Sequence, residues 1–543
     1  MKVQFFGPLG RVTGSCALLT DERLGVRILV DAGMRQGEGD PRPWNEGELP
    51  FDAASLTHIV LTHAHIDHCG LLPRVFMAGF AGNVICTPET AALAQIELED
   101  AANLSDGFSV ADARKVRFDA RDAFGLGGYF SIARNVFLQF FRTSHILGAV
   151  SVRLSWGPKG PEQRSILFSG DLGTNVEGHE RFLFLGHRMA PPQSTYLVAE
   201  STYGNRLRTG AVETFEGRTQ NLARELRSAR QRGGTTLIAS FAMDRLQTLM
   251  LDLAYLAARD AELAATPTFV HAPLGKRISS VYARFVRAKD IHKTGVLSRW
   301  LSESAFTHLG LDPASVEDEK RLEDAIVSVL DPSAAPSTSL PGLRRVHQWV
   351  DRRPLPTGPH VVLTSSGMLE GGPVAQYLPD VLADSCSTLL LPGYAGPATT
   401  AGQLLALGPL LAAQRERLSG TITLPDGTVI AQKHVRARVV SLGGYSAHAD
   451  QRGLVDWIVP EQSGRRRAAS ETLFIQHGDD AARDGLRRAV LAKAPNTRIV
   501  LPTSETNTFD LDAPPVRSET DTLRAENEAL RAELARLRGR SAA

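Results

Sequence analysis

The sequence has little cysteine, and none of its four cysteines belongs to a close pair. Cys16, Cys69, Cys86 and Cys386 are far apart, and no CxxC spacing occurs. This scarcity argues against both a disulfide framework and a closed structural zinc site built from paired cysteines. We expect reduced thiols in a reducing compartment.

Long apolar runs and an excess of charge are missing as well. No run of about twenty apolar residues that could cross a membrane occurs. Residues 1–7 lead directly into a strand-like segment without the apolar core of a signal peptide. The sequence therefore predicts a soluble, cytoplasmic protein without a membrane partner. With 60 Lys+Arg against 59 Asp+Glu, composition carries no overall signature of nucleic-acid binding, so such evidence must come from local patches.

The most informative segment is rich in histidine. Residues 62–70 read Thr-His-Ala-His-Ile-Asp-His-Cys-Gly and follow an apolar run at 56–61. Imidazole nitrogen and carboxylate oxygen suit zinc and similar divalent ions. The pattern predicts a catalytic metal site with open coordination positions at the end of a strand. The alternative is a surface histidine cluster, which this spacing behind a buried strand does not favour.

The spacing within this segment indicates room for two ions. His63 and His65 are two residues apart and share one side of an extended segment. Asp67 and His68 follow in the turn and could face a second ion nearby.

A chain of 543 residues is too long for one ordinary core, so two folded units plus appendages are expected. Up to about residue 201, short apolar runs alternate with glycine-rich turns and one helical pattern, which indicates a layered α/β or α+β core. The strands are expected at 26–30, 83–86, 136–141, 150–154 and 165–168, and the helix at 89–102.

Three of these expected strands deliver ligand-type side chains to a turn. Asp31, His145 and Asp171 each lie within four residues after an apolar run, and strand ends are where rigid scaffolds present metal ligands. Each residue alone is more typical of a structural turn. Their value lies in adding to the cluster at His63.

The pattern changes after residue 205, where a second α/β unit is expected. A helix at 214–230, a strand at 235–240 and a helix at 245–258 follow one another, and buried strands at 267–274 and 360–369 feed loops. The loop at 365–372 is rich in hydroxyl groups and glycine. Its residues Ser365, Ser366 and Gly367 could offer backbone N–H groups to an RNA phosphate, and Arg245 could supply a charge. Residues 315–353 are assigned no chemistry.

Two further histidine motifs lie near the end of the folded part. His448 stands in Gly-Tyr-Ser-Ala-His-Ala-Asp at 444–450, and His477 follows an expected strand at 472–475. The unperturbed pKa range of histidine suits a general acid. Taken alone, either residue is better read as a structural histidine.

Together these motifs resemble the metallo-β-lactamase-fold nucleases that carry a β-CASP domain, of the RNA-specific type. That type includes the cleavage and polyadenylation endonuclease subunit and its bacterial and archaeal relatives. The resemblance extends to about residue 505. It rests on Phe6-Gly7, 12–16, 31–33, the histidine motif, Ser144-His145, Gly170-Asp171, Ala-Glu-Ser-Thr-Tyr-Gly at 199–204 and the two later histidine motifs.

The resemblance implies an α/β fold: an αββα metallo-β-lactamase domain with an inserted β-CASP α/β domain. The first part of the metallo-β-lactamase domain would span 1–204, the β-CASP domain 205–392 and the second part 393–505.

It also implies a site with two zinc ions. One ion would be bound by His63, His65 and His145, and the other by Asp67, His68 and His477. Asp171 would bridge the two ions, and Asp31 would support them from beneath. The catalytic residues would be Asp67, Glu200 and His448, with His448 paired to Glu200 and protonating the leaving oxygen. The family usually has glutamate after the histidine and glycine that match His477-Gly478, whereas this chain has Asp479, whose contacts are left open.

The implied function is a zinc-dependent ribonuclease. A two-metal-activated water would hydrolyse RNA phosphodiester bonds and leave a 5′-phosphate and a 3′-hydroxyl. RNA is favoured over DNA because the family's DNA-processing enzymes usually lack a histidine matching His477. A DNA nuclease, a small-molecule phosphodiesterase and an inactive RNA-binding scaffold remain alternatives, although intact ligand positions weigh against the scaffold. Endonuclease and exonuclease action both stay open.

The C-terminal residues predict a linker at 506–518 and a short coiled-coil helix at 519–539. The residues that indicate the coiled coil are spaced alternately by four and three: Leu523, Asn527, Leu530, Leu534 and Leu537. The pattern predicts a homodimer or a partner protein bound through this helix. Because the pattern is short, an isolated solvated helix is the alternative.

Overall fold

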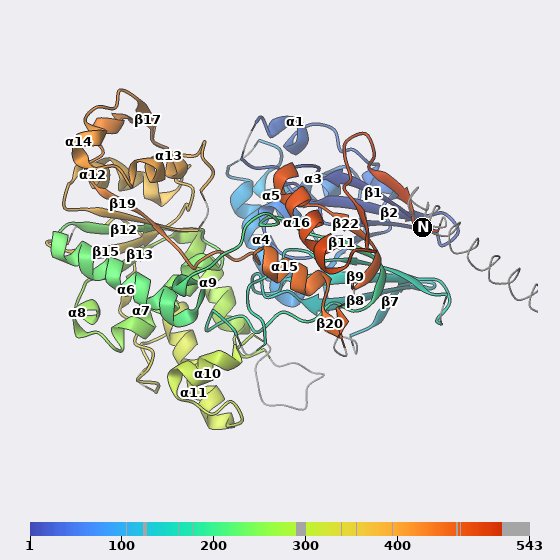
Figure 1. The fold of residues 1–543 in the computed structure, drawn as a ribbon, viewed down its shortest axis with the longest axis horizontal. Helices are drawn as coiled ribbons and strands as arrows, with labels where there is room; N and C mark the ends of the chain where they lie inside the picture. Colours follow the sequence, from blue (N-terminus) through green and yellow to red (C-terminus); the bar gives the residue numbers. More distant parts are fainter. Residues whose placement is uncertain are drawn as a thin grey trace, which may run out of the picture.

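Two lobes lie side by side in the computed structural model (Figure 1). The structure describes residues 1–512, apart from positions 38, 105, 123–127, 161, 178, 289–299, 338, 355, 394, 463, 464 and 467. Both ends of this described chain build the first lobe, while the green to orange middle of the chain builds the second. The predicted coiled coil, including Leu523, Asn527, Leu530, Leu534 and Leu537, lies outside the described residues.

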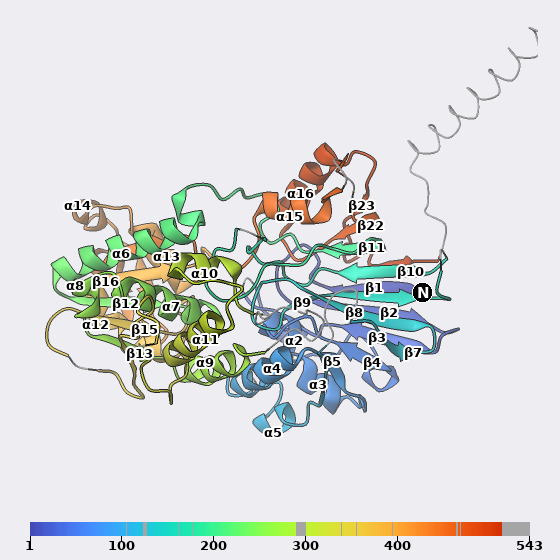
Figure 2. The same ribbon diagram turned by 90° about the horizontal axis from the view of Figure 1, so that it is seen from below.

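The first lobe has four layers, in which two sheets face each other and helices cover both outer faces (Figure 2). Each sheet has seven strands. The first sheet has the order β24-β1-β2-β3-β4-β5-β6, with β1 Lys2–Gly7, β2 Cys16–Asp21, β3 Val26–Val30, β4 His58–Val60, β5 Val84–Cys86, β6 Phe118–Ala120 and β24 Thr508–Asp510. The second has the order β23-β22-β11-β10-β9-β8-β7, with β7 Phe130–Ala133, β8 Val136–Arg142, β9 Val150–Trp156, β10 Arg164–Phe168, β11 Ser194–Ala199, β22 Ser470–Ile475 and β23 Arg498–Val500.

Helices from both ends of the chain cover these sheets. Those beside the first sheet are α1 Arg42–Asn45, α2 Ile66–Cys69, α3 Leu72–Met77, α4 Pro88–Ala101 and α5 Val110–Ala113, and those beside the second are α15 Gln451–Ile458 and α16 Asp480–Lys493. The helix α4 confirms the helical pattern expected at 89–102. On the second sheet, Leu454 and Leu486 pack against Leu197 in one apolar cluster. The predicted four-layer arrangement is therefore present.

The second lobe is built on a six-stranded sheet whose strands are all parallel. Its order is β14-β13-β15-β12-β16-β19, with β12 Thr235–Ala239, β13 Thr268–His271, β14 His347–Trp349, β15 His360–Thr364, β16 Thr388–Pro392 and β19 Arg438–Leu442. A parallel sheet has both faces covered, so its strands are apolar on both sides. Successive residues in β12 show this, because Leu237 belongs to one apolar cluster and Ile238 to another.

The helices of the second lobe connect these parallel strands. They are α6 Phe215–Arg232, α7 Arg245–Ala257, α8 Ala261–Ala264, α9 Pro273–Phe285, α10 Glu303–Leu309, α11 Val316–Leu330, α12 Leu378–Ala383, α13 Thr400–Leu407 and α14 Ala412–Arg415. Two small hairpins complete the described structure: β17 Thr421–Thr423 with β18 Val429–Ala431, and β20 Glu461–Gln462 with β21 Arg465–Arg466. No helix among the described residues combines the length and apolarity needed to span a bilayer.

The second lobe ends later than predicted. We expected the chain to return to the first lobe at residue 393, but β19 pairs with β16 in parallel, with Thr388 opposite Arg438. Two neighbouring parallel strands need a long crossover, and residues 393–437, which include α13, provide it. The boundary at 392/393 is therefore wrong, and the return follows Leu442.

An arm of the second lobe docks into the first through Trp300. This side chain is completely buried, and its Nε1 donates a hydrogen bond to Glu89 at the start of α4, at 2.9 Å. The Trp300 carbonyl accepts from the backbone N–H of Leu185 at 2.8 Å. The two lobes thus share one apolar core at this contact.

Replacing this anchor tests how firmly the lobes are joined. We expect Trp300→Ala to lower the free energy of unfolding by about 3–5 kcal/mol because it leaves a large cavity, as measured by urea denaturation. Met77→Ala is the control, since Met77 is 55% exposed and should change stability by less than about 0.5 kcal/mol. A Trp300→Ala loss as small as that of the control would contradict the docking role.

Candidate active site

The carboxyl ends of several strands meet at one edge of the first lobe. The strands β10, β11 and β22 are parallel neighbours, and β8 runs in the same direction because β8 and β10 are both antiparallel to β9. This edge faces the second lobe (Figure 2). His145, Asp171, Glu200 and His477 lie within three residues of the ends of these strands, and His63 follows β4 of the facing sheet. The two sheets therefore bring most of the predicted site residues together.

The structure gathers the predicted metal ligands into adjoining groups. In each group the potential ligand atoms lie within 4.8 Å of one another. The groups are His63, His65, His145 and Asp171; Asp67, His68 and His477; and Asp171, Glu200 and His448. All the residues predicted from sequence for the metals and for proton transfer are therefore in one place.

Within the first group, three imidazole nitrogens converge. Nε2 of His63 and Nε2 of His145 each lie 3.1 Å from Nδ1 of His65. In the second group, Nε2 of His68 lies 3.1 Å from Nε2 of His477, which is 3.6 Å from Oδ2 of Asp67. Each group thus presents lone pairs to a common point.

The Asp171 carboxylate stands between the two groups. Its Oδ2 lies 3.5 Å from Nε2 of His63 and 3.4 Å from Nε2 of His145. Its Oδ1 lies 3.3 Å from Nε2 of His68 and 3.5 Å from Nε2 of His477. One oxygen therefore faces each group, as a bridging ligand would.

Sharp backbone turns make this convergence possible. Asp31, Ser144 and His477 have positive φ angles of 59°, 59° and 53°, a conformation that is uncommon for non-glycine residues and clusters at functional sites. Gly33 allows another close approach, since a Cβ there would lie 1.6 Å from the carbonyl oxygen of Asp67. At Gly173 a Cβ would lie 1.8 Å from the carbonyl oxygen of Ser144.

Asp31 lies beneath the second group, where the sequence placed it. Its Oδ2 is 2.8 Å from Nδ1 of His68, and it accepts hydrogen bonds from the backbone N–H and the hydroxyl of Thr62, at 2.8 and 2.9 Å. A carboxylate behind a histidine ligand orients the ring and raises its basicity.

Two threonines that were not predicted also contact histidines of the site from behind, as Asp31 does. The Thr62 hydroxyl is 3.1 Å from Nδ1 of His63, and the Thr202 hydroxyl is 3.1 Å from Nδ1 of His477. Both stand inside motifs that the sequence analysis used: Thr62 precedes His63, and Thr202 lies two residues after Glu200. Their position in those motifs was the available signal.

Burial favours the neutral form of the three imidazoles in the first group. Removal from water lowers the pKa of His65 to about 4 and holds the pKa values of His63 and His145 well below the ordinary value. Neutral imidazoles can bind a metal without first losing a proton.

The second group lies in a more negative environment. Burial lowers the pKa of His68, but Asp171 and Asp31 outweigh it and raise that pKa well above the ordinary value. This concentration of negative charge also favours a bound cation.

His448 and Glu200 form the predicted pair. Nδ1 of His448 lies 3.2 Å from both carboxylate oxygens of Glu200, and Glu200 accepts from the backbone N–H of Leu172 at 2.6 Å. Burial lowers the pKa of His448, but Glu200 and Asp171 raise it overall. A raised pKa favours the protonated form of the imidazole, which a general acid needs.

The contacts of Asp479, left open by the sequence, belong to a helix terminus. Asp479 is exposed and precedes α16, and its side chain accepts from the backbone N–H of Ala482 at 2.7 Å. An N-cap needs a short acceptor, which aspartate supplies better than glutamate.

The predicted phosphate-binding residues follow two neighbouring strands of the second lobe, β12 and β15. Arg245 begins α7, is 5% exposed, pairs with Asp244 and lies 5.2 Å above the ring of Phe182. Ser365 and Ser366 follow β15, and Gly367 packs against Phe241. Within the described part of the chain, no hydrogen bond joins Arg245 to this loop.

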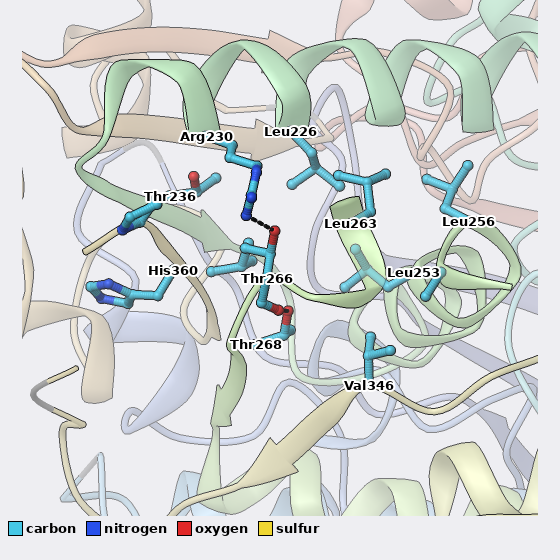
Figure 3. Close-up of a pocket in the computed structure, with 13 residues that line it drawn as sticks. Leu226, Arg230, Thr236, Leu253, Leu256, Leu263, Thr266, Thr268, Val346 and His360 are labelled. Atoms are coloured by element: carbon cyan, nitrogen blue, oxygen red, sulfur yellow. Dashed lines mark hydrogen bonds between the residues drawn. The ribbon is translucent and has the colours of Figure 1, made fainter. Parts of the chain in front are cut away.

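A cavity outside the site lies at the amino ends of β12, β13 and β15 (Figure 3). Its walls are mainly apolar, and its one cation, Arg230, donates to the Thr266 hydroxyl at 3.0 Å. The space is about 10 Å³, which is near the volume that one water molecule requires. We assign it to packing.

The support beneath the metal ligands can be tested by binding. We expect Asp31→Asn to weaken the binding of a divalent metal by about 10–100-fold, because His68 loses a negatively charged partner. Competition with a chelating indicator measures this, with the exposed Asp40→Asn as control. Unchanged affinity in Asp31→Asn would contradict the supporting role.

Three known domain families match successive parts of the chain. The metallo-β-lactamase superfamily matches residues 9–201, the β-CASP domain matches 246–404, and the Zn-dependent metallo-hydrolase RNA specificity domain matches 432–502. These matches extend over both lobes.

Several known proteins are similar to this chain over most of its length. Ribonuclease TTHA0252 of Thermus thermophilus is 29% identical over 463 residues, which are 85% of this chain and 91% of that protein. Transcription termination factor FttA of Methanosarcina mazei is 25% identical over 91% of this chain and 69% of its own length. An RNase J-like protein of Methanocaldococcus jannaschii is 23% identical over 88% of this chain and 92% of its own length. The chain belongs to the metallo-β-lactamase superfamily and is a metal-dependent hydrolase with a β-CASP domain.

Proposed function

We propose that the protein is a ribonuclease that hydrolyses RNA phosphodiester bonds with two zinc ions and leaves a 5′-phosphate and a 3′-hydroxyl. The observation that carries this proposal is the position of Asp171, whose two oxygens face separate groups of imidazoles. One carboxylate shared between two ligand groups is the arrangement that a two-metal phosphodiesterase needs.

The side chains fit zinc in number and kind. His63, His65 and His145 offer three nitrogens to one ion, and Asp67, His68 and His477 offer two nitrogens and an oxygen to the other. Nitrogen-rich sets of this size are typical of catalytic zinc with open positions. Oδ1 of Asp171 is buried and accepts no hydrogen bond from any described residue, which a bound cation would explain.

The chain's own residues would then divide the chemistry. Bound zinc would supply an activated water and neutralise charge on the phosphate. Asp67, at the edge of the second group, would accept a hydrogen bond from that water and orient it. His448, held by Glu200, would donate a proton to the leaving 3′-oxygen.

RNA is the substrate best supported. The RNA specificity domain matches residues 432–502, which include both His448 and His477, and ribonucleases are among the similar proteins. Arg245 and the loop of Ser365, Ser366 and Gly367 are proposed contacts for RNA phosphates. A DNA nuclease and a small-molecule phosphodiesterase with the same site remain the alternatives.

Cleavage of a 5′-labelled single-stranded RNA tests the proposal. We expect Asp67→Ala and His68→Ala to lose about 10²–10³-fold in cleavage rate, because each removes a ligand worth several kcal/mol. The exposed Asp40→Ala should cleave normally. A chelator should abolish cleavage, and zinc should restore it.

The products decide the remaining alternatives. A ladder of fragments would indicate an endonuclease and mononucleotides an exonuclease, while competition with DNA and dinucleotides would rank the substrates. RNA that binds without being cut by the zinc-loaded protein would contradict the proposal and favour a binding scaffold.

We also propose, from the sequence pattern alone, that Leu530, Leu534 and Leu537 mediate a homodimer or contact a partner helix. A cytoplasmic location likewise stays a prediction. Deleting the residues after Ser518 should lower the particle mass in light scattering from that of a dimer to that of a monomer. An unchanged mass would contradict self-association through this segment.

A further inference from the structure

His448 reaches the metal site from the second lobe. It follows β19, the last strand of that lobe's sheet, whereas its partners Glu200 and Asp171 belong to the first lobe. The backbone N–H of Ala449 donates to the carbonyl of Leu172 at 2.7 Å. The position of the proton donor therefore depends on how the loop at 443–450 is held between the lobes.

A buried ion pair in the second lobe anchors the start of this loop. Nε and Nη2 of Arg218 on α6 donate to the two carboxylate oxygens of Asp252 on α7, at 2.9 and 3.0 Å. The hydroxyl of Tyr445 donates to Oδ2 of Asp252 at 2.8 Å. Exposure of these three residues is 0%, 1% and 0%, respectively, so water does not compete for the bonds.

The backbone around Tyr445 is held just as closely. Gly444 has a positive φ of 89°, and a Cβ there would lie 2.4 Å from the carbonyl oxygen of Val212 and 2.9 Å from Cγ of Arg218. Nη2 of Arg181 donates to the Gly444 carbonyl at 3.1 Å. The backbone at the start of the loop is therefore closely confined.

The far end of the loop is also fixed. Nη2 of Arg208 donates to the carbonyl of His448, and the backbone N–H of Arg208 donates to Asp450 at 3.0 Å. His448 thus lies between an anchor at Tyr445 and a second anchor at Arg208.

A buried ion pair is a weak source of stability, because removing two charges from water offsets most of their attraction. Its bidentate geometry, however, specifies position closely. Tyr445 packs its ring in the interior, and only its hydroxyl needs Asp252. The network is therefore better suited to setting the place of the loop than to stabilising the lobe.

We propose that Arg218, Asp252 and Tyr445 are positioning residues that set the reach of His448 to the leaving-group oxygen. This inference rests on the proposed function, in which His448 protonates that oxygen. A displacement of about 1 Å in a reacting group can cost about 10²-fold in rate, so a small shift of the loop would be visible in kinetics.

The leaving group separates positioning from general damage. The 3′-oxygen of RNA needs a proton as it departs, whereas the p-nitrophenolate of bis(p-nitrophenyl) phosphate departs without one. We expect Tyr445→Phe, which removes only the hydroxyl, to slow RNA cleavage by about 10–100-fold. On the nitrophenyl ester the same variant should change kcat by less than about 2-fold, because that leaving group needs no proton from His448.

The matched control is Tyr377→Phe. Tyr377 is another buried tyrosine of the second lobe, and its hydroxyl lies 2.8 Å from Nδ1 of His271, outside the site. This variant should cleave both substrates at the rate of the natural chain. In a His448→Ala background, Tyr445→Phe should have no further effect on RNA cleavage, because the group it positions is gone.

Equal losses of Tyr445→Phe on both substrates would overturn the inference, as would undiminished RNA cleavage. If the unaltered protein hydrolyses the nitrophenyl ester but not RNA, the proposed function fails first, and the inference fails with it. Should Tyr445→Phe not fold, Arg218→Lys takes its place in the same comparison, since lysine keeps the charge but cannot bond Asp252 bidentately.

Discussion

The buried carboxylate of Asp171 is the group on which the rest of the site depends. It is 2% exposed and lies 3.3–3.8 Å from nitrogens of His63, His68, His145, His448 and His477. A charge buried in this way is costly unless positive charge surrounds it. The surrounding imidazoles, and any cation they bind, can supply that positive charge. They are brought close to Asp171 by the strand ends, by the sharp turns at Asp31 and Ser144 and by the close approach at Gly173.

The two lobes contribute different parts of the chemistry. In the proposed mechanism, the first lobe would hold the metal ions at the carboxyl ends of its strands, and the second would deliver His448 on the loop after β19. Carboxyl ends of parallel strands in the second lobe also carry Ser365 and Ser366. The substrate would therefore lie between two strand edges that face each other, which is where open α/β sheets commonly bind ligands.

Much of the site could be predicted from sequence because its ligands follow apolar strands directly. His63, His145 and Asp171 each stand within a few residues of a buried run, so the local pattern marked them as candidates, and the family resemblance supplied their roles as ligands. The four-layer order of the first lobe followed from the resemblance, and the structure agrees with it.

The rest depended on contacts between distant residues. The end of the second lobe was misplaced because β19 is short, mixes Arg438 and Ser441 with apolar residues, and is recognisable as a strand only through its pairing with β16. The network of Arg218, Asp252 and Tyr445 joins residues 34 and 193 positions apart. No local pattern marks such contacts, since each of these side chains alone resembles an ordinary helix or loop residue.

The central claim is that Asp171 joins two metal ions. Anomalous X-ray diffraction from crystals of the zinc-loaded protein, recorded above and below the zinc absorption edge, tests it most directly. The account predicts two peaks about 3.5–4 Å apart, one beside each oxygen of Asp171 and each surrounded by its own group of histidines. A single peak, or peaks away from Asp171, would contradict it.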